Sequence, residues 1–102
     1  MIPVQISDAA IVDISNMWDQ IATISAAAAS RISDDVIDSS LSLGQFPERH
    51  PRLPTLGSQI RRMVVGSWAV VYEVNPGMVE ILRIVPTGAD LTLLQLRPSS
   101  ES

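Results

Sequence analysis

The hydrophobic pattern of this chain changes its period once, near residue 45. Before that point apolar side chains recur every three or four residues, which is the period of an amphipathic helix. After it, short runs rich in β-branched residues alternate with turns that contain glycine or proline, which is typical of antiparallel strands. Because the helical and strand segments are separated along the chain, the pattern predicts an α+β fold in which helices cover one face of an antiparallel sheet.

The helical part is predicted to begin after a short strand. Residues 3–7 alternate weakly between apolar and polar, which suggests the strand. Ser7 then offers a hydroxyl that can cap a helix over about residues 8–24. The apolar stripe of this helix is predicted to consist of Ile11, Ile14, Trp18 and Ile21, and to end at the small residue Ser25.

A second helix follows with almost no linker, so the two helices should form a hairpin. Ser25 can cap it, and the four alanines at positions 26–29 favour its start because alanine has the highest helix propensity. Gly44 stands where a glycine commonly ends a helix. The apolar face of the second helix is predicted to contain Ile32, Val36 and Leu43.

The second half of the chain is predicted to be a meander that follows a proline-rich loop at residues 45–58. Gly66-Ser67 and Asn75-Pro76-Gly77 are the two turn signals. The strands are expected at residues 60–65, 68–74 and 78–85.

The last part of the chain is apolar and then polar. Residues 91–96 are expected to form a final short strand or a tail packed on the core, and residues 97–102 are predicted to be frayed. A length of 102 residues and an apolar share of 46 % suit one domain, residues 1–102, with one core. The apolar surplus also suggests that some apolar surface is left for a partner.

Charge is distributed unevenly, and every positive charge is an arginine. Residues 1–45 hold one arginine and six aspartates, a net charge of −5, whereas residues 46–102 hold six arginines and five carboxylates, a net charge of +1. An acidic chain is repelled by nucleic acid at long range. The chain has no cysteine, no signal-peptide pattern and no apolar run near the ~20 residues of a membrane span, so we expect a cytoplasmic protein.

No cluster of residues predicts a catalytic or metal site. His50, the only histidine, has no evident acid–base partner in the sequence. Asp34, Asp35 and Asp38 could pair as catalytic carboxylates, but at helical spacing they more simply form a solvated face that could meet a basic partner. We therefore expect no catalytic residue, no metal and no cofactor.

Three arginines on the predicted strands stand out. Arg61 and Arg62 are consecutive, so their side chains should point to opposite faces of the sheet. Arg83 lies within an apolar strand, where a charge is costly unless it is paired, and Glu73 or Glu80 could be its partner.

The order of these elements and the amino-acid sequences of several segments resemble the RelE/ParE toxin superfamily, and the ParE branch in particular. Residues 25–31 (Ser-Ala-Ala-Ala-Ala-Ser-Arg) resemble the family's Asn-Pro-x-Ala-Ala-x-Arg helix link, and residues 43–48 (Leu-Gly-Gln-Phe-Pro-Glu) resemble its Leu-x-x-Phe-Pro-x stretch. Residues 60–74 resemble the hairpin Leu-Arg-x-x-x-Val-Gly-x-Tyr-x-x-x-Tyr-x-Val. Residues 79–85 resemble the strand Val-x-Ile-Leu-Arg-Val-Leu. The likeness covers about residues 3–91.

This resemblance implies a toxin of a type II toxin–antitoxin module, such as those that stabilise plasmids. It implies inhibition of DNA gyrase and neutralisation by a ParD-like antitoxin, which would bind DNA through its N-terminal segment and wrap the toxin with its C-terminal stretch. Such a toxin is a binding inhibitor and not an enzyme, and it touches DNA only through its antitoxin. The residues that the resemblance indicates as contacts to target or antitoxin are Arg61, Arg62, Trp68, Arg83 and Asp90.

The sequence also departs from the family pattern. Where the family often has His-Gly-x-Arg-Asp, this chain has Pro86-Thr87-Gly88-Ala89-Asp90. RelE-type members use lysines, arginines and a C-terminal tyrosine to cleave messenger RNA on the ribosome. This chain has no lysine, and its only tyrosine, Tyr72, lies in a predicted strand, where it shares a face with Trp68 and is expected to pack in the core. A ribosome-dependent endoribonuclease is therefore the second hypothesis, and a non-toxic scaffold or corepressor is the third.

Overall fold

The elements follow the chain in the predicted order of one strand, two helices and three strands. The computed structural model of the protein describes residues 1–94 and 96, so the tail predicted to be frayed, residues 97–102, lies outside the described residues. The helices and strands are β1 (Val4–Ile6), α1 (Asp8–Ala22), α2 (Ala26–Leu41), β2 (Ile60–Val65), β3 (Trp68–Asn75) and β4 (Met78–Pro86). Short 3-10 turns occur at Ser42–Gly44, Pro47–Arg49 and Leu91–Leu93.

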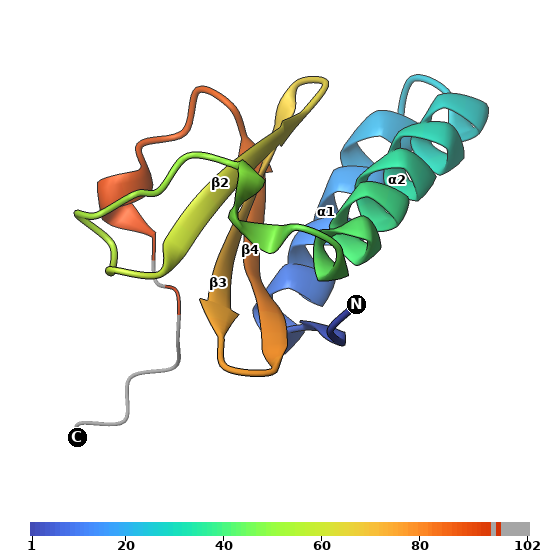
Figure 1. The fold of residues 1–102 in the computed structure, drawn as a ribbon. Helices are drawn as coiled ribbons and strands as arrows, with labels where there is room; N and C mark the ends of the chain where they lie inside the picture. The colour runs from blue at the N-terminus through green and yellow to red at the C-terminus, as the bar shows by residue number, and fades with distance from the viewer. Residues whose placement is uncertain (95, 97–102) are drawn as a thin grey trace.

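The four strands form one sheet in the order β1-β4-β3-β2 (Figure 1). β2, β3 and β4 form the predicted antiparallel meander, and its two turns lie at Gly66-Ser67 and Pro76-Gly77. β1 pairs with β4 in parallel, with Val4 opposite Val79, so the sheet is mixed rather than wholly antiparallel. A parallel neighbour needs a long crossover connection, and the helical hairpin supplies most of it.

Both helices begin at the predicted caps. The Ser7 hydroxyl accepts a hydrogen bond from the Ala10 backbone N–H at 3.1 Å, and the Ser25 hydroxyl accepts one from the Ala28 N–H at 3.1 Å. Each cap satisfies one of the backbone donors that the first turn of a helix leaves without an intrahelical partner. The helical hairpin predicted from the serine and alanine pattern is confirmed.

The buried face of α1 is the predicted one only in part, at Ile14 and Ile21. Ala10 and Met17 are fully buried, and Ile14 and Ile21 pack against the same core. Ile11 and Trp18, which the sequence placed on the inner stripe, are 53 % and 39 % exposed. Positions 10, 14, 17 and 21 have the same spacing of three and four as the predicted stripe. The choice between the two stripes is therefore made by where α2 and the sheet contact α1.

The predicted inner face of α2 is largely correct: Val36 is fully buried, Ile32 packs against the core, and Leu43, just beyond the helix, is also fully buried. The prediction for Gly44 is wrong: the helix ends at Leu41, and Gly44 closes the 3-10 turn that follows. Gly44 accepts a hydrogen bond from the Ile2 N–H at 3.1 Å, and a β-carbon there would collide with the Ile2 carbonyl oxygen. Glycine is needed here for a close backbone approach and not for a helix end.

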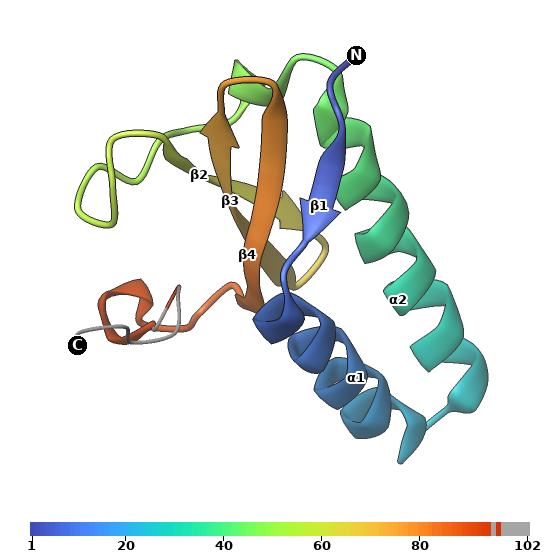
Figure 2. The same cartoon turned by 90° about the horizontal axis from the view of Figure 1, so that it is seen from below.

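Both faces of the sheet are covered (Figure 2). The helices lie on one side, where the main core cluster includes Met17, Val36 and Tyr72. On the other side the loop after α2 and the C-terminal segment cover a second cluster, which is centred on Ile60, Val71 and Leu82. The C-terminal apolar residues thus form a packed tail and not a further strand among the described residues. None of the described helices has the length and apolar character needed to cross a bilayer.

Candidate functional site

Arg61 fixes the loop that precedes its own strand. Its Nη1 donates to the carbonyl oxygen of Glu48 at 3.0 Å and to that of His50 at 2.7 Å. Arg52 and Arg61 also form a backbone bridge, so the loop runs along the outer edge of β2. The guanidinium is thus oriented by backbone carbonyls.

Arg62 lies on the opposite face of β2, as predicted for consecutive strand residues. It lines a surface hollow of about 390 Å³ together with His50, Pro51, Leu53 and Val64. Most of these residues are apolar, so the hollow presents one guanidinium and one imidazole beside apolar surface. A guanidinium in this position can hold a carboxylate or a phosphate in a planar, two-point geometry.

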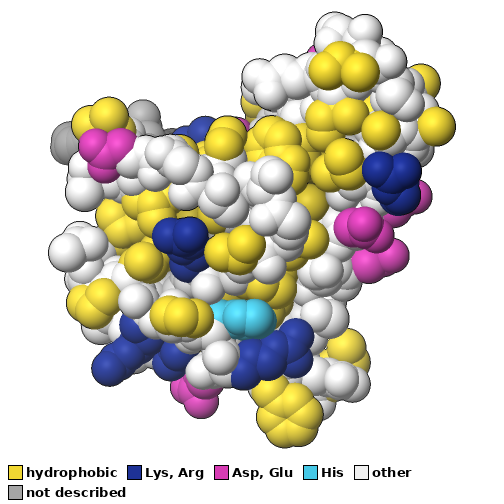
Figure 3. Space-filling model, turned by 90° about the horizontal axis from the view of Figure 1, so that it is seen from above, with side chains coloured by type: hydrophobic (Ala, Val, Ile, Leu, Met, Phe, Trp, Pro, Cys, Tyr) yellow, Lys and Arg dark blue, Asp and Glu magenta, His cyan; other side chains and the backbone are white. Residues whose placement is uncertain are grey.

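Other basic residues surround these two arginines. Arg49 donates from Nε to the Nε2 of His50 at 3.2 Å and from Nη1 to the Gln45 carbonyl at 3.2 Å. The resulting basic cluster consists of Arg49, His50, Arg52, Arg61 and Arg62. Figure 3 shows arginine side chains on either side of the histidine on this face. Sequence reasoning missed Arg49 and Arg52, although four of the seven arginines lie between positions 49 and 62.

Tyr72 lies beside His50, a member of the basic cluster, and the surroundings of both side chains shift their pKa values. Tyr72 is fully buried, as predicted, and its hydroxyl donates to the Pro47 carbonyl at 2.6 Å. Burial raises the pKa of Tyr72 to about 12, although nearby Arg61 and Arg49 act in the opposite direction. Burial, with a contribution from Arg49, lowers the pKa of His50 from 6.5. The two rings meet edge to face with centroids 6.3 Å apart.

Arg83 is tied to the helical layer. Its Nε and Nη2 donate to the two carboxylate oxygens of Asp13 at 2.7 and 2.9 Å, and the Ile84 backbone N–H donates to the same carboxylate at 2.9 Å. The sequence suggested Glu73 or Glu80 as its partner and did not point to Asp13, which lies 70 positions away on α1. The bond to Asp13 is also the largest cause of the raised pKa of Arg83.

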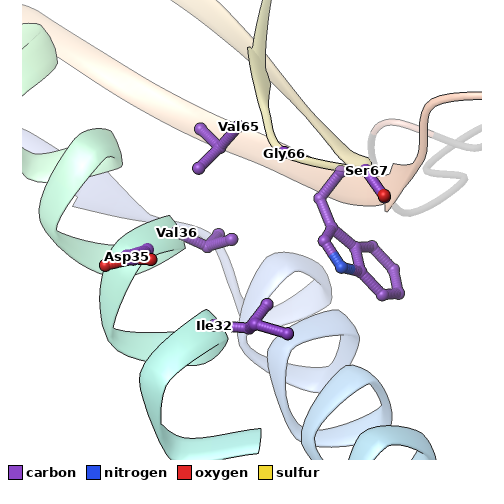
Figure 4. A pocket seen from close by; sticks show the side chains of 7 residues that line it. Ile32, Asp35, Val36, Val65, Gly66 and Ser67 are labelled. Atoms are coloured by element: carbon purple, nitrogen blue, oxygen red, sulfur yellow. The ribbon is translucent and has the colours of Figure 1, made fainter. Parts of the chain in front are cut away.

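The remaining predicted site residues lie apart from the basic cluster. Trp68 is half-buried against the main core and borders a hollow of about 220 Å³ between the first hairpin turn and α2, together with Ile32, Asp35, Val36, Val65, Gly66 and Ser67 (Figure 4). Asp90 is exposed and caps the last 3-10 turn, where it accepts bonds from the Thr92 N–H at 3.0 Å and hydroxyl at 2.6 Å. These bonds lower the pKa of Asp90. The structure therefore brings together Arg61 and Arg62. Arg83 lies two strands away, opposite the same residue of β3, Val71, as Arg62, whereas Trp68 and Asp90 lie elsewhere.

The described residues offer no group of three His, Asp or Glu side chains placed to hold a metal ion. The basic cluster is a cationic surface on a loop and an edge strand, with apolar surface beside it. Its chemistry suits the recognition of anionic groups.

Comparison with known proteins identifies the family of the chain. The sequence profile of the ParE toxin of the type II toxin–antitoxin system parDE matches residues 4–91. The chain belongs to the ParE toxin family. The match spans β1 through the start of the last 3-10 turn and includes every element that forms the basic cluster. No curated protein matches the chain over its sequence.

Solved structures of ParE and RelE type share the fold. The chromosomal ParDE toxin–antitoxin system of P. aeruginosa aligns with a TM-score of 0.72 and 18 % identity, covering 84 % of this chain and 96 % of that chain. The RelBE2 toxin–antitoxin complex of Mycobacterium tuberculosis aligns with a TM-score of 0.66 and 18 % identity, covering 83 % and 96 %. At this identity the likeness establishes the fold, in which an N-terminal strand and a helical hairpin accompany a four-stranded sheet.

Proposed function

We propose that this ParE-family toxin inhibits DNA gyrase in the cytoplasm, stalling it on cleaved DNA, and that a ParD-like antitoxin neutralises it. The toxin acts by binding and is not an enzyme. The family profile over residues 4–91 is that of ParE toxins, for which the resemblance implies gyrase as the target. The basic cluster on the loop and β2 is the contact surface that the described structure offers to such a target.

The state of the only tyrosine supports gyrase inhibition over RNA cleavage. The resemblance implies that RelE-type members cleave messenger RNA with lysines, arginines and a C-terminal tyrosine. The only tyrosine is buried with its hydroxyl bound to the Pro47 carbonyl, and its pKa of about 12 keeps it protonated. The chain also has no lysine. A binding mechanism needs none of these groups.

A supercoiling assay tests the proposal directly. Purified protein, gyrase, ATP and plasmid should yield an increased fraction of cleaved DNA after denaturation, in proportion to the toxin added. A translation extract that receives the same protein should keep its messages intact. Site-specific cuts in those messages, with gyrase unaffected, would reject the proposal.

A ribosome-dependent endoribonuclease is the second candidate. The arginines around His50 would suit a phosphodiester backbone, and the fold is shared with a RelBE2 complex. The extract assay above separates the two candidates. If expression of the protein arrests growth neither through gyrase nor through cleavage of messenger RNA, the third hypothesis, a non-toxic scaffold or corepressor, takes their place.

Exposed apolar side chains on α1 support an antitoxin partner. Ile11, Val12 and Trp18 are 53 %, 57 % and 39 % exposed on this helix. Trp18 also lines a groove of about 460 Å³ on the outer side of the hairpin, whose rim carries Asp19 and Asp34. An amphipathic segment with basic residues would cover the apolar surface and meet the acidic rim. Complexes of related toxins with antitoxins have the same toxin fold.

Arg62 is the proposed contact residue with the clearest test. Its guanidinium borders the hollow beside His50 and Leu53, whereas Arg83 is held by Asp13 and Asp90 by Thr92. Arg62→Ala should weaken binding to gyrase or antitoxin by roughly ten- to a hundredfold, the effect of one lost charge-assisted contact of about 1.5 to 3 kcal/mol. Arg31→Ala, on the exposed surface of α2, removes the same charge elsewhere and serves as the matched control. Equal binding by both variants would remove Arg62 from the contact surface.

A further inference from the structure

Phe46 adopts a backbone conformation that side chains other than glycine rarely take. Its φ and ψ are 51° and 56°, in the left-handed region, and it is the non-glycine residue with positive φ in the described chain. A residue before proline normally takes an extended conformation, so Pro47 adds to the strain. The side chain is 79 % exposed.

Hydrogen bonds to the loop backbone on both sides of Phe46 hold this conformation. The Phe46 carbonyl itself accepts from the Arg49 N–H at 3.2 Å, and the neighbouring carbonyls accept from three side chains. These bonds run from Arg49 to Gln45, from Tyr72 to Pro47, and from Arg61 to Glu48 and His50. A strained residue persists only where its surroundings over-determine it, and this loop meets that condition.

The fold gains no packing from an aromatic ring at this position. Phe46 belongs to neither of the two core clusters, and most of its surface is open to solvent. Glycine or asparagine would adopt the same backbone angles at a lower cost. The loop therefore holds a large apolar side chain outward, on a rigid support, at the border of the basic cluster.

We propose that Phe46 is the anchor with which the toxin docks on its target, inserting into an apolar hollow of a protein surface that carries carboxylates around it. Phe46 supplies the apolar contact, and Arg49 and its neighbours in the basic cluster supply the matching charge. An aromatic residue close to an arginine, on a loop that does not have to be ordered upon binding, has the composition of an interface hot spot. The inference rests on the proposed function, since the target in question is gyrase.

Charge favours a protein surface over nucleic acid as the occupant. The whole chain carries −4 and its first 45 residues carry −5, so an extended polyanion would meet repulsion outside the cluster. A compact acidic protein surface meets only the cluster itself. Arginine is also the side chain best suited to hold carboxylates in a fixed geometry.

The test uses the left-handed backbone conformation of Phe46, which glycine adopts without strain. Phe46→Gly removes the ring but relieves the strain, so its melting temperature should stay within about 4 °C of the wild type. The concentration of toxin needed for half-maximal cleavage by gyrase should rise about tenfold or more. Phe46→Trp should keep most of the effect, because it retains an aromatic anchor. Ile24→Ala, which truncates a 90 % exposed side chain in the turn between the helices, should behave as the wild type.

The other possible outcomes also decide whether Phe46 is the anchor. If Phe46→Gly keeps wild-type potency, or if Ile24→Ala loses as much potency as Phe46→Gly, the anchor role of Phe46 is rejected. If the wild type binds a short DNA duplex without gyrase, and Phe46→Gly abolishes this binding, the docking partner is nucleic acid and not a protein surface.

If the wild type does not promote cleavage by gyrase, the proposed function is wrong, whatever the role of Phe46. Growth arrest on induction of the same variants then tests the anchor, which is rejected if Phe46→Gly arrests growth as the wild type does.

Discussion

At the scale of single residues, two side chains join parts of the fold that lie far apart in the sequence. Asp13 accepts bonds from the Arg83 guanidinium and from the Ile84 backbone, so one carboxylate links α1 to β4. Tyr72 links β3 to the loop through Pro47. Both sets of bonds are largely shielded from water, where an unmade bond is costly.

The Asp13–Arg83 pair predicts a stability effect. The two side chains are only 11 % and 23 % exposed. Arg83→Ala should lower the free energy of unfolding by about 1.5 to 3 kcal/mol, somewhat less than for a fully buried pair. Urea denaturation followed by tryptophan fluorescence measures the change. Arg62→Ala, the control, should change stability by less than about 1 kcal/mol. Equal stability of the Arg83 variant and the wild type would show that the pair does not hold the two layers together.

Tyr72 predicts a loss of stability at high pH. Its pKa is raised to about 12 in the folded chain from 10.0, so the folded state keeps the proton more tightly than the unfolded state. The resulting stabilisation is fully present below pH 10 and is lost as pH rises from about 10 to 12. Because Tyr72 is the only tyrosine, tyrosinate absorbance reports it alone. Titration near pH 10 in the folded protein, as in urea, would contradict the expectation.

At the scale of elements, the start of α1 covers an edge that β1 leaves open. β1 pairs with β4 only as far as Ile81, which leaves the next residues of β4 without a strand neighbour on that side. The Ser7 N–H donates to the Ile81 carbonyl at 3.0 Å, and the Ser7 hydroxyl donates to the Leu82 carbonyl at 3.0 Å. Asp13 accepts from Ile84 nearly two turns further along the helix. Covering an edge in this way prevents pairing with other chains.

A comparison of the two helix caps tests this role of Ser7. Ser25 only caps α2, so Ser25→Ala should cost about 1 kcal/mol of stability. Ser7 caps α1 and also donates to Leu82, so Ser7→Ala should cost about 1 kcal/mol more. Thermal melts of the two variants under the same conditions give the difference. If the two losses are equal, the bond to Leu82 adds nothing to a simple cap.

At the scale of the whole molecule, exposed apolar residues predict behaviour in solution. The chain is 46 % apolar and leaves Ile11, Val12 and Trp18 exposed on α1. We expect the isolated chain to self-associate, and co-expression with the antitoxin to prevent this by covering the apolar surface. Sedimentation velocity over a range of concentrations measures the association, and Trp18→Ser should reduce it. A stable monomer at high concentration would contradict the prediction.

The basic cluster could be predicted only in part, because its members come from segments of different kinds. The strand residues Arg61 and Arg62 were found from their positions on a regular element. Arg49 and His50 lie in a proline-rich loop, whose path no periodicity describes. That path is set by bonds from Arg61 and Tyr72 to backbone carbonyls. Backbone carbonyls are present at every residue, so the sequence does not mark which of them will accept.

The sequence by itself determined the local elements, because the signals for them are local. Ser7 and Ser25 cap the two helices, the turns at Gly66 and Pro76 join the strands, and the change of period separates helices from sheet. Tertiary structure alone decided three features: which α1 stripe is buried, which carboxylate meets Arg83, and that β1 runs parallel to β4. The last two depend on residues 70 or more positions apart, and for the first, helical spacing fits either stripe equally well. The burial of Met17 in place of Trp18 follows from the position of the sheet, which no pattern within α1 encodes.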